Sequence, residues 1–201
     1  MPERSYAVLF LSQRDSARSV MAAALLNQIG RGQFRAFSAG VRPVQAYDPV
    51  ALELLEHAHV EVPAGAPQHY RVFAGAEAPR LDFVFTLSDT AAGETLPVWP
   101  GQPVTGHWSL QDPQRHEDDS VAHRRSLIST RSQLERRLRV FANLPLESLD
   151  RLSLQAHVDD IGAPGEDDES NHSDDNEDAP SDAKAPKPAP AVPARTPPPP
   201  D

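Results

Sequence analysis

Residues 7–19 read Ala-Val-Leu-Phe-Leu-Ser-Gln-Arg-Asp-Ser-Ala-Arg-Ser, and the remainder of the chain can be arranged around them. The five apolar residues at the start are typical of a buried strand in a parallel sheet. The polar residues that follow run directly into a helical pattern. Because the first amides of a helix lack partners and its dipole favours negative charge, this order of strand, tight loop and helix predicts an anion site.

Strand and helix patterns alternate along the rest of the chain. The predicted strands cover residues 6–11, 34–38, 81–87 and 104–108, and the predicted helices cover 17–29, 49–58, 120–144 and 146–158. Alternation of this kind predicts βαβ units, in which helices cover both faces of a parallel sheet. Ligands of such sheets bind beyond the carboxyl ends of the strands, where the polar loop after the first strand is expected.

Charge and composition divide the chain into two parts. The formal net charge of −10 is uneven, since residues 1–157 hold 16 basic and 17 acidic side chains, whereas residues 158–201 hold 3 and 12. The second part is acidic at first and then rich in proline and alanine. Such a composition cannot bury enough apolar surface to offset the entropy of ordering. We therefore expect one domain over residues 1–161 and a disordered tail over residues 162–201.

Composition also excludes several classes of function. The 201 residues contain no cysteine, which excludes disulfides, thiolate catalysis and cysteine metal sites. A nearly neutral domain offers no basic surface for nucleic acid or for an anionic membrane. No apolar run approaches the roughly 18 residues of a membrane span, and the N-terminus lacks the features of a signal peptide. We expect a cytoplasmic protein with no metal, cofactor, nucleic-acid or membrane partner.

The loop ends in Ser16-Ala17-Arg18-Ser19, and this motif is shared with a known family. The other matching stretches are residues 37–40, 49–55, 83–86, 91–95, 97–103, 107–108, 112–113 and 144–152. Together they resemble the thioredoxin-linked arsenate reductases, which are built on the low-molecular-weight protein tyrosine phosphatase fold and carry the loop C-T-G-N-S-A-R-S. The resemblance covers about residues 6–161 and implies a three-layer α/β/α fold with a four-stranded parallel sheet.

The resemblance also implies roles for individual positions. In the family, a loop cysteine attacks an arsenate or phosphoryl centre as a thiolate, and a loop arginine binds the oxyanion with two parallel donors. An aspartate in an Asp-Pro turn protonates the leaving oxygen. In the arsenate reductases, two further cysteines carry the oxidising equivalents away as a disulfide. These roles fall on positions 12, 18 and 112, with the two further cysteines expected at positions 88 and 96.

This chain departs from the family at every redox position. Ser12, Ser88 and Leu96 stand where cysteines are expected, so reduction of arsenate by the family mechanism is chemically impossible. A serine hydroxyl is not appreciably ionised in such a site, and the loop contains no histidine to act as its base. Asp112 follows the family pattern, but its role as an acid lapses without a thiol partner.

Binding of an oxyanion depends on the residues that remain in the loop. The candidate binding residues are Ser12, Gln13, Arg14, Asp15, Ser16, Ala17 and Arg18, and the candidate ligands are phosphate, arsenate and sulfate. Arg18 and Arg14 favour a bound anion, whereas the carboxylate of Asp15 opposes it to a degree set by its orientation. Arg14 replaces a family glycine and Asp15 replaces an asparagine. The first exchange strains the loop if position 14 requires a positive φ.

Three hypotheses for the function follow. The leading one is a catalytically inactive arsenate-reductase-like protein that binds an oxyanion or a phosphorylated ligand at residues 12–18. The first alternative is a slow phosphomonoester hydrolase that uses Ser12 or a bound water together with Asp112 and Arg18. The second is an interaction scaffold that recruits a protein partner through its acidic tail. The arginines between positions 124 and 139 are interpreted as a solvated helix face, with docking of the acidic tail as the alternative.

Overall fold

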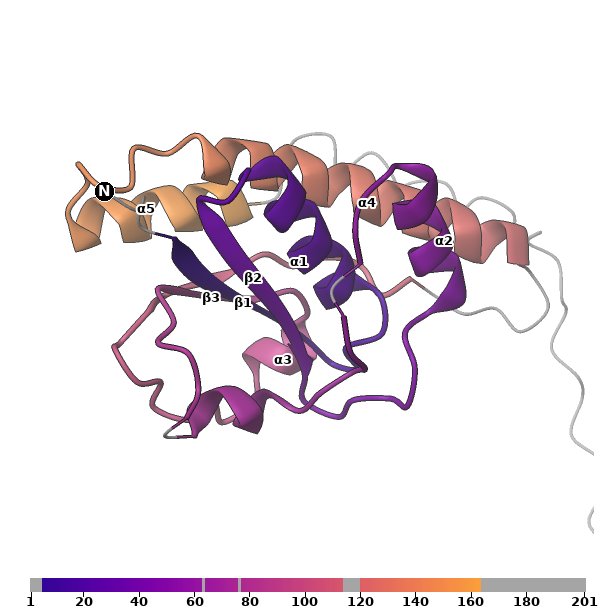
Figure 1. Cartoon of the computed structure of the whole chain (residues 1–201), viewed down its shortest axis with the longest axis horizontal. Helices are drawn as coiled ribbons and strands as arrows, with labels where there is room; N and C mark the ends of the chain where they lie inside the picture. Colours follow the sequence, from indigo (N-terminus) through magenta and orange to yellow (C-terminus); the bar gives the residue numbers. More distant parts are fainter. Residues whose placement is uncertain (1–4, 63, 76, 114–119, 164–201) are drawn as a thin grey trace, which may run out of the picture. The chain divides into compact units, whose positions relative to one another are not determined.

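The computed structural model describes residues 5–62, 64–75, 77–113 and 120–163 (Figure 1). All of them belong to one compact unit, Met1–Pro164. A second unit, Gly165–Asp201, lies outside the described residues, and nearly all of the predicted tail lies there with it. The division between domain and tail therefore stays a proposal.

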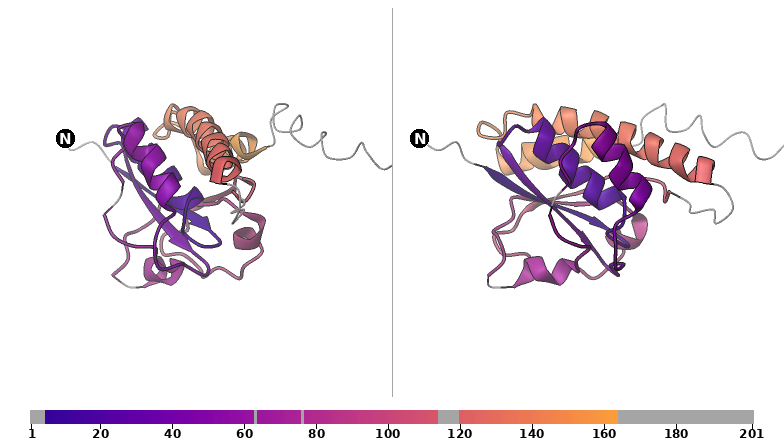
Figure 2. Two further views of the ribbon diagram at one scale, coloured as in Figure 1. Left: turned by 90° about the vertical axis from the view of Figure 1, so that its right-hand side faces the viewer. Right: turned by 45° about the vertical axis from the view of Figure 1, so that its right-hand side comes forward.

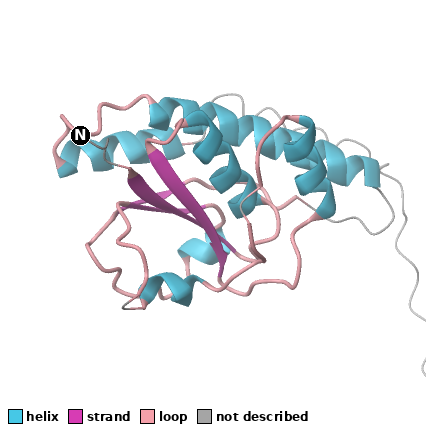
Figure 3. Ribbon diagram, viewed as in Figure 1, coloured by secondary structure: helices cyan, strands magenta, loops and turns pink. Residues whose placement is uncertain are grey.

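The sheet has four parallel strands in the order β2-β1-β3-β4. The strands are magenta in Figure 3. Their bounds are β1 Tyr6–Ser12, β2 Phe34–Gly40, β3 Phe83–Thr86 and β4 Val104–His107. The chain passes from β1 to β2 on one side and then returns to β3 on the other. The order of strands therefore reverses at the carboxyl end of β1, which is where open parallel sheets bind ligands.

Helices cover both faces of this sheet, as predicted. Figures 1 and 2 show α1, α2, α4 and α5 together on one face, and α3 with the short 3-10 helix η1 on the other. Their bounds are α1 Arg18–Ile29, α2 Pro49–His57, η1 Tyr70–Ala74, α3 Asp89–Ala92, α4 Ser120–Ala142 and α5 Arg151–Gly162. The three-layer α/β/α fold with a four-stranded parallel sheet is confirmed.

Strand β1 has an apolar sequence because side chains on both of its faces are buried. Val8 and Phe10 point into the larger core cluster, beneath the four longer helices. Leu9 and Leu11 point to the opposite face, into the smaller cluster beside α3 and η1. All four side chains are fully buried, because both faces of β1 are covered and alternate residues point to opposite faces.

The C-terminal helix begins and ends later than the sequence predicted. Helix α5 starts at Arg151 and not near Leu146, because the Asp150 side chain caps it by accepting the amide of Ser153 at 2.9 Å. The residues just before this cap form a turn. The other predicted elements shift by only one or two residues at each end. The sequence also gave no indication of η1 and α3, since they are only five and four residues long.

Candidate functional site

The loop of residues 12–18 joins β1 to α1, and neighbouring backbone fixes its orientation. The carbonyl oxygens of residues 12, 13, 14 and 16 accept the amides of residues 41, 42, 44 and 48 at 2.8–3.1 Å. A trans peptide points its N–H away from its own C=O, so the amides of residues 13, 14, 15 and 17 point to the opposite side. The Asp15 amide agrees with this, since it donates to Ser12 Oγ at 3.1 Å. The loop therefore turns these amides to the side opposite its carbonyl contacts, and the amide of Asp15 reaches the Ser12 hydroxyl.

Helix α1 adds further donors to this array. It begins at Arg18, after Ala17, and no side chain caps its first amides. Its first turn contains no acidic residue that would neutralise the positive end of the helix dipole. The uncapped N-terminus and the loop amides together favour a negatively charged ligand.

A small cavity of about 30 Å³ lies within this arrangement. Its lining consists of Ser12, Arg14, Ser16, Ala17, Arg18, Asp48, Asp112 and Pro113. The volume exceeds the roughly 10–15 Å³ that a single water needs, so a small polar ligand is the appropriate size class. The structure thus brings five of the seven predicted loop residues to one cavity together with Asp112, whereas Gln13 and Asp15 are not part of its lining.

Arg18 ties the loop to the segment after β4. One arm of its guanidinium donates to the carbonyl oxygen of Leu110 at 2.9 Å, and the other donates to Asp112 Oδ1 at 2.8 Å. The Arg18 side chain is 7% exposed and that of Asp112 is 61% exposed. Burial lowers the pKa of Arg18 and the charge of Asp112 opposes this shift, but an arginine stays protonated in proteins. Arg18 is therefore a buried cation at the edge of the cavity.

Asp15 turns its carboxylate away from the cavity. Its Oδ1 accepts the hydroxyl of Ser19 and its Oδ2 accepts the backbone amide of Gln68, at 2.8 and 2.9 Å. Burial raises the pKa of Asp15, while the hydrogen bonds from Gln68, Ser19 and Ser38 lower it. The expected opposition between this carboxylate and a bound anion is thus reduced by its orientation behind the loop.

The exchange of glycine for Arg14 causes no backbone strain. The described non-glycine residues with positive φ are Asp15, Arg31, His59 and Gln102, and Arg14 is not among them. The left-handed position in the loop is Asp15, with φ of 49°, and aspartate adopts this region more readily than most residues. Arg14 is exposed and places a second cation at the cavity.

The other two positions expected to be cysteine have structural roles. Ser88 caps α3, because its hydroxyl accepts the amide of Ala91 at 3.3 Å. The amide of Leu87 donates to the carbonyl of Leu11 at 2.7 Å, which brings this cap to the carboxyl end of β1. Leu96 is partly buried and packs against the smaller core cluster.

Two contacts of buried polar residues were not predicted from the sequence. Asp48 Oδ1 caps α2 by accepting the amide of Val50 at 2.9 Å, and its Oδ2 lies 3.0 Å from Nε2 of the buried His123. The Asp-Pro start of α2 was a signal for the cap, but no signal linked two residues 75 positions apart. Arg137 corrects the interpretation of a solvated arginine face, because it is buried and donates to the carbonyl of Ser109 at 3.1 Å.

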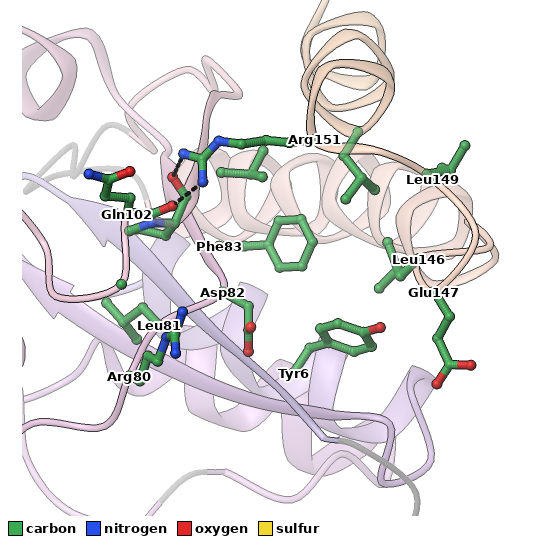
Figure 4. Close-up of a pocket in the computed structure, with 14 residues that line it drawn as sticks. Tyr6, Arg80, Leu81, Asp82, Phe83, Gln102, Leu146, Glu147, Leu149 and Arg151 are labelled. Carbon is green, nitrogen blue, oxygen red and sulfur yellow. Dashed lines mark hydrogen bonds between the residues drawn. The ribbon is translucent and has the colours of Figure 1, made fainter.

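A larger cavity of about 540 Å³ lies at the opposite edge of the sheet, where β1, β3 and β4 begin (Figure 4). Arg151 extends into it but donates to the backbone carbonyls of Gln102 and Pro103. Glu147 and Asp82 add negative charge to its lining. Arg80 also lines it, so two basic and two acidic side chains balance in charge, and this cavity is not the candidate anion site.

Neither a metal centre nor a membrane span emerges from the described part of the chain. Within those residues, no three histidine, aspartate or glutamate side chains are grouped so that they could hold a metal ion. No helix there is both long and apolar enough to cross a membrane.

Comparison with known families identifies the class of protein to which this fold and loop belong. The sequence profile of the family described as low molecular weight phosphotyrosine protein phosphatase matches residues 7–153. This span exceeds half of the chain, so the protein belongs to the low molecular weight phosphotyrosine protein phosphatase family. No curated protein matched the sequence.

Similar solved structures include several arsenate reductases. The enzyme from Archaeoglobus fulgidus is 24% identical with a TM-score of 0.51, over 65% of this chain and 98% of its own. A thioredoxin-dependent arsenate reductase from Corynebacterium glutamicum is 22% identical with a TM-score of 0.50, over 69% of this chain and 61% of its own. An arsenate reductase in a phosphate-binding state is 22% identical with a TM-score of 0.54, over 68% and 96%. These likenesses concern the fold.

Proposed function

We propose that this protein binds a tetrahedral oxyanion, or the phosphoryl group of a phosphorylated ligand, in the loop of residues 12–18. The observation that carries the proposal is the cavity lined by Arg18, by the loop and by the uncapped start of α1. Amide groups at a helix start favour anions, and a guanidinium adds charge-assisted hydrogen bonds. A phosphate-binding state of an arsenate reductase with this fold supports the choice of ligand.

The same proposal holds that the thiol chemistry of the family is absent. A thiolate nucleophile and a disulfide both require sulfur, and the chain contains no cysteine. Ser12 replaces the nucleophile, while Ser88 and Leu96 occupy the positions of the disulfide relay and act in capping and packing. The protein is thus proposed as a member of the fold that binds oxyanions without reducing arsenate. Its cytoplasmic location and a partner for its tail stay predictions.

Calorimetry tests the binding proposal directly. Phosphate, arsenate and sulfate are titrated into the full-length protein and into Arg18→Ala. Arg125→Ala serves as the matched control, because Arg125 is an exposed arginine of α4 and is not part of the cavity lining. We expect binding in the natural protein and in Arg125→Ala, and a loss of at least about tenfold in Arg18→Ala, as for a charged hydrogen bond. Absence of heat with all three anions would refute the proposal.

A slow phosphomonoester hydrolase is the second candidate function. It is favoured by one observation, that Ser12, Asp112 and Arg18 all line the same cavity. In this role Asp112 would protonate the leaving oxygen and Ser12 or a water would attack phosphorus. Steady turnover of p-nitrophenyl phosphate that is lost in both Ser12→Ala and Asp112→Asn would support it, and zero turnover would remove it.

A further inference from the structure

A chain of three side chains runs from the cavity to a buried carboxylate. Ser12 Oγ lies 2.8 Å from Ser19 Oγ, and Ser19 Oγ lies 2.8 Å from Asp15 Oδ1. All three residues are buried, and of the three only Ser12 lines the cavity beside Arg18. The chain therefore connects the candidate anion site to a group that accepts protons.

The donors and acceptors fix the direction of this chain. An ionised carboxylate only accepts, so Ser19 donates its single hydroxyl proton to Asp15. Toward Ser12, Ser19 Oγ is then an acceptor, and Ser12 donates its own proton to it. One lone pair of Ser12 Oγ accepts the amide of Asp15 at 3.1 Å, which leaves the other for a phosphorus atom.

We propose that Ser12 is a phosphoryl acceptor, which takes the phosphoryl group of an aryl phosphate while its proton passes through Ser19 to Asp15. The proposal rests on the oxyanion binding proposed above, because the loop must first hold the phosphoryl group over Ser12. Phosphoryl transfer needs little prior ionisation of the attacking hydroxyl, and protein kinases use an aspartate to accept its proton. Ser12 is the catalytic residue, and Ser19 and Asp15 position it and receive its proton.

The step balances with the aryl phosphate as its only co-reactant. The bond between phosphorus and the aryl oxygen breaks as the bond between phosphorus and Ser12 Oγ forms. The Ser12 proton moves to Ser19 and the Ser19 proton moves to Asp15 Oδ1, while the aryl oxide leaves with its electron pair. The products are a phosphoserine at position 12, a neutral Asp15 and a phenolate, and Asp15 then returns its proton to solvent.

Position 15 decides which way the chain carries the proton. The backbone N–H of Gln68 can only donate, so an asparagine at position 15 would turn its side-chain oxygen toward that N–H. Its NH₂ group would then donate to Ser19, and Ser19 would donate to Ser12. Asp15→Asn therefore reverses the direction of the hydrogen bonds among these three side chains with almost no change in size. It leaves Ser12 without a proton acceptor.

The surroundings of Asp15 suit a base. Burial raises the pKa of its carboxyl from the ordinary value of 3.8, although the hydrogen bonds that it accepts oppose this shift. A general base is most effective when its pKa approaches the working pH. An ionisable group near it is Tyr47, whose pKa is raised by burial and by the charge of Asp15.

The experiment mixes full-length protein with excess p-nitrophenyl phosphate at mildly alkaline pH. Released p-nitrophenolate is followed by absorbance, and the protein is examined by intact mass and peptide mapping. We expect a burst of one p-nitrophenolate per chain and one phosphoryl group on Ser12, and neither in Ser12→Ala. The burst should be at least about 100-fold slower in Asp15→Asn and in Ser19→Ala, since a general base contributes roughly 10²–10⁴-fold.

Two further measurements separate the relay from a purely structural role. Asp15→Asn should bind inorganic phosphate at least as tightly as the natural protein, because one negative charge near the anion is removed. The burst rate should rise with pH in the natural protein as Asp15 ionises, and it should not follow that rise in Asp15→Asn. Phosphate binding with no phosphorylation of Ser12, or with an equal burst in Asp15→Asn, would overturn this inference alone. Absence of phosphate binding in the natural protein would overturn the proposed function as well.

Discussion

Arg18 donates to Asp112 across 2.8 Å, and this ion pair joins the start of α1 to the segment that follows β4. The same guanidinium also donates to the carbonyl of Leu110. An anion that enters the cavity therefore competes with a carboxylate for the strongest cation there. Asp112, which the family pattern marks as an acid, acts in this chain as a partner of the arginine.

Asp112→Asn should strengthen phosphate binding. The substitution removes the competing charge while keeping a similar shape, and because the Asp112 carboxylate is exposed to solvent, the pair is worth about 0.2–1 kcal/mol. We expect the dissociation constant for phosphate to fall by up to about fivefold, measured by calorimetry at low ionic strength. Weaker binding in Asp112→Asn would mean that Asp112 supports the site and does not compete for it.

Gly40→Ala should disrupt the loop from behind. A Cβ at Gly40 would lie 2.9 Å from the carbonyl carbon of Arg14 and from the amide nitrogen of Asp15, closer than real Cβ contacts. The loop backbone would have to move, at a cost of about 1–3 kcal/mol in the free energy of unfolding, as for other overpacked sites. We expect phosphate affinity to fall at least about tenfold. Gly75→Ala is the control, because Gly75 has φ of −76° and no atom within 4 Å of its added Cβ; equal losses in both variants would contradict this account.

Asp15→Asn should change the pH dependence of stability. Burial raises the pKa of Asp15 in the native state above the ordinary value of 3.8, which applies to the unfolded state. Between these two pKa values, Asp15 is protonated in the native state and ionised in the unfolded state. The free energy of unfolding therefore falls as pH rises through that interval, by at most about 1.4 kcal/mol per pH unit. Asparagine has no such charge, so the variant should gain stability relative to the natural protein at neutral pH. Urea unfolding at several pH values measures this gain, which should vanish below pH 3.8; a gain that grows in acid would contradict it.

Ser12→Cys should restore a reactive thiol only in combination with Asp15→Asn. In the single variant, Ser19 still donates to Asp15, so the new thiolate receives no hydroxyl and has a negative charge beyond Ser19. In the double variant, Ser19 is free to donate to the thiolate, and the charge is gone. The thiol pKa, followed by ultraviolet absorbance of the thiolate, should be lower in the double variant, and its phosphatase activity higher. Neither variant should reduce arsenate, because Ser88 and Leu96 supply no thiol for the disulfide.

The sequence predicted the sheet and its order of elements well because the strands are apolar on both faces. Leu9 and Phe10 point to opposite faces and are both buried, and a continuous apolar run reports that environment directly. The start of α5 was wrong because Leu146, Leu149 and Leu152 recur every three residues, and this spacing was counted as helix. The competing signal was Asp150, whose side chain caps the helix after the first two of these leucines.

For the site, the sequence predicted which residues gather at the loop but not which way they point. Asp15 was expected to oppose an anion, whereas its carboxylate faces Ser19 and Gln68 behind the loop. Gln68 lies 53 positions from Asp15, and no local pattern relates residues that far apart. The same limit hid the pairing of Asp48 with His123, which depends on the packing of α4 beside α2.

The backbone hydrogen bonds between the loop and residues 41–48 affect how a ligand is recognised. Four loop carbonyls are already held, so the receptor is shaped before any anion arrives. Binding then requires little ordering of the chain, and most of the interaction energy remains as affinity. We expect selectivity among phosphate, arsenate and sulfate to follow the fit of each ion to the fixed loop, with association as fast as diffusion and steering by Arg14 and Arg18 allow.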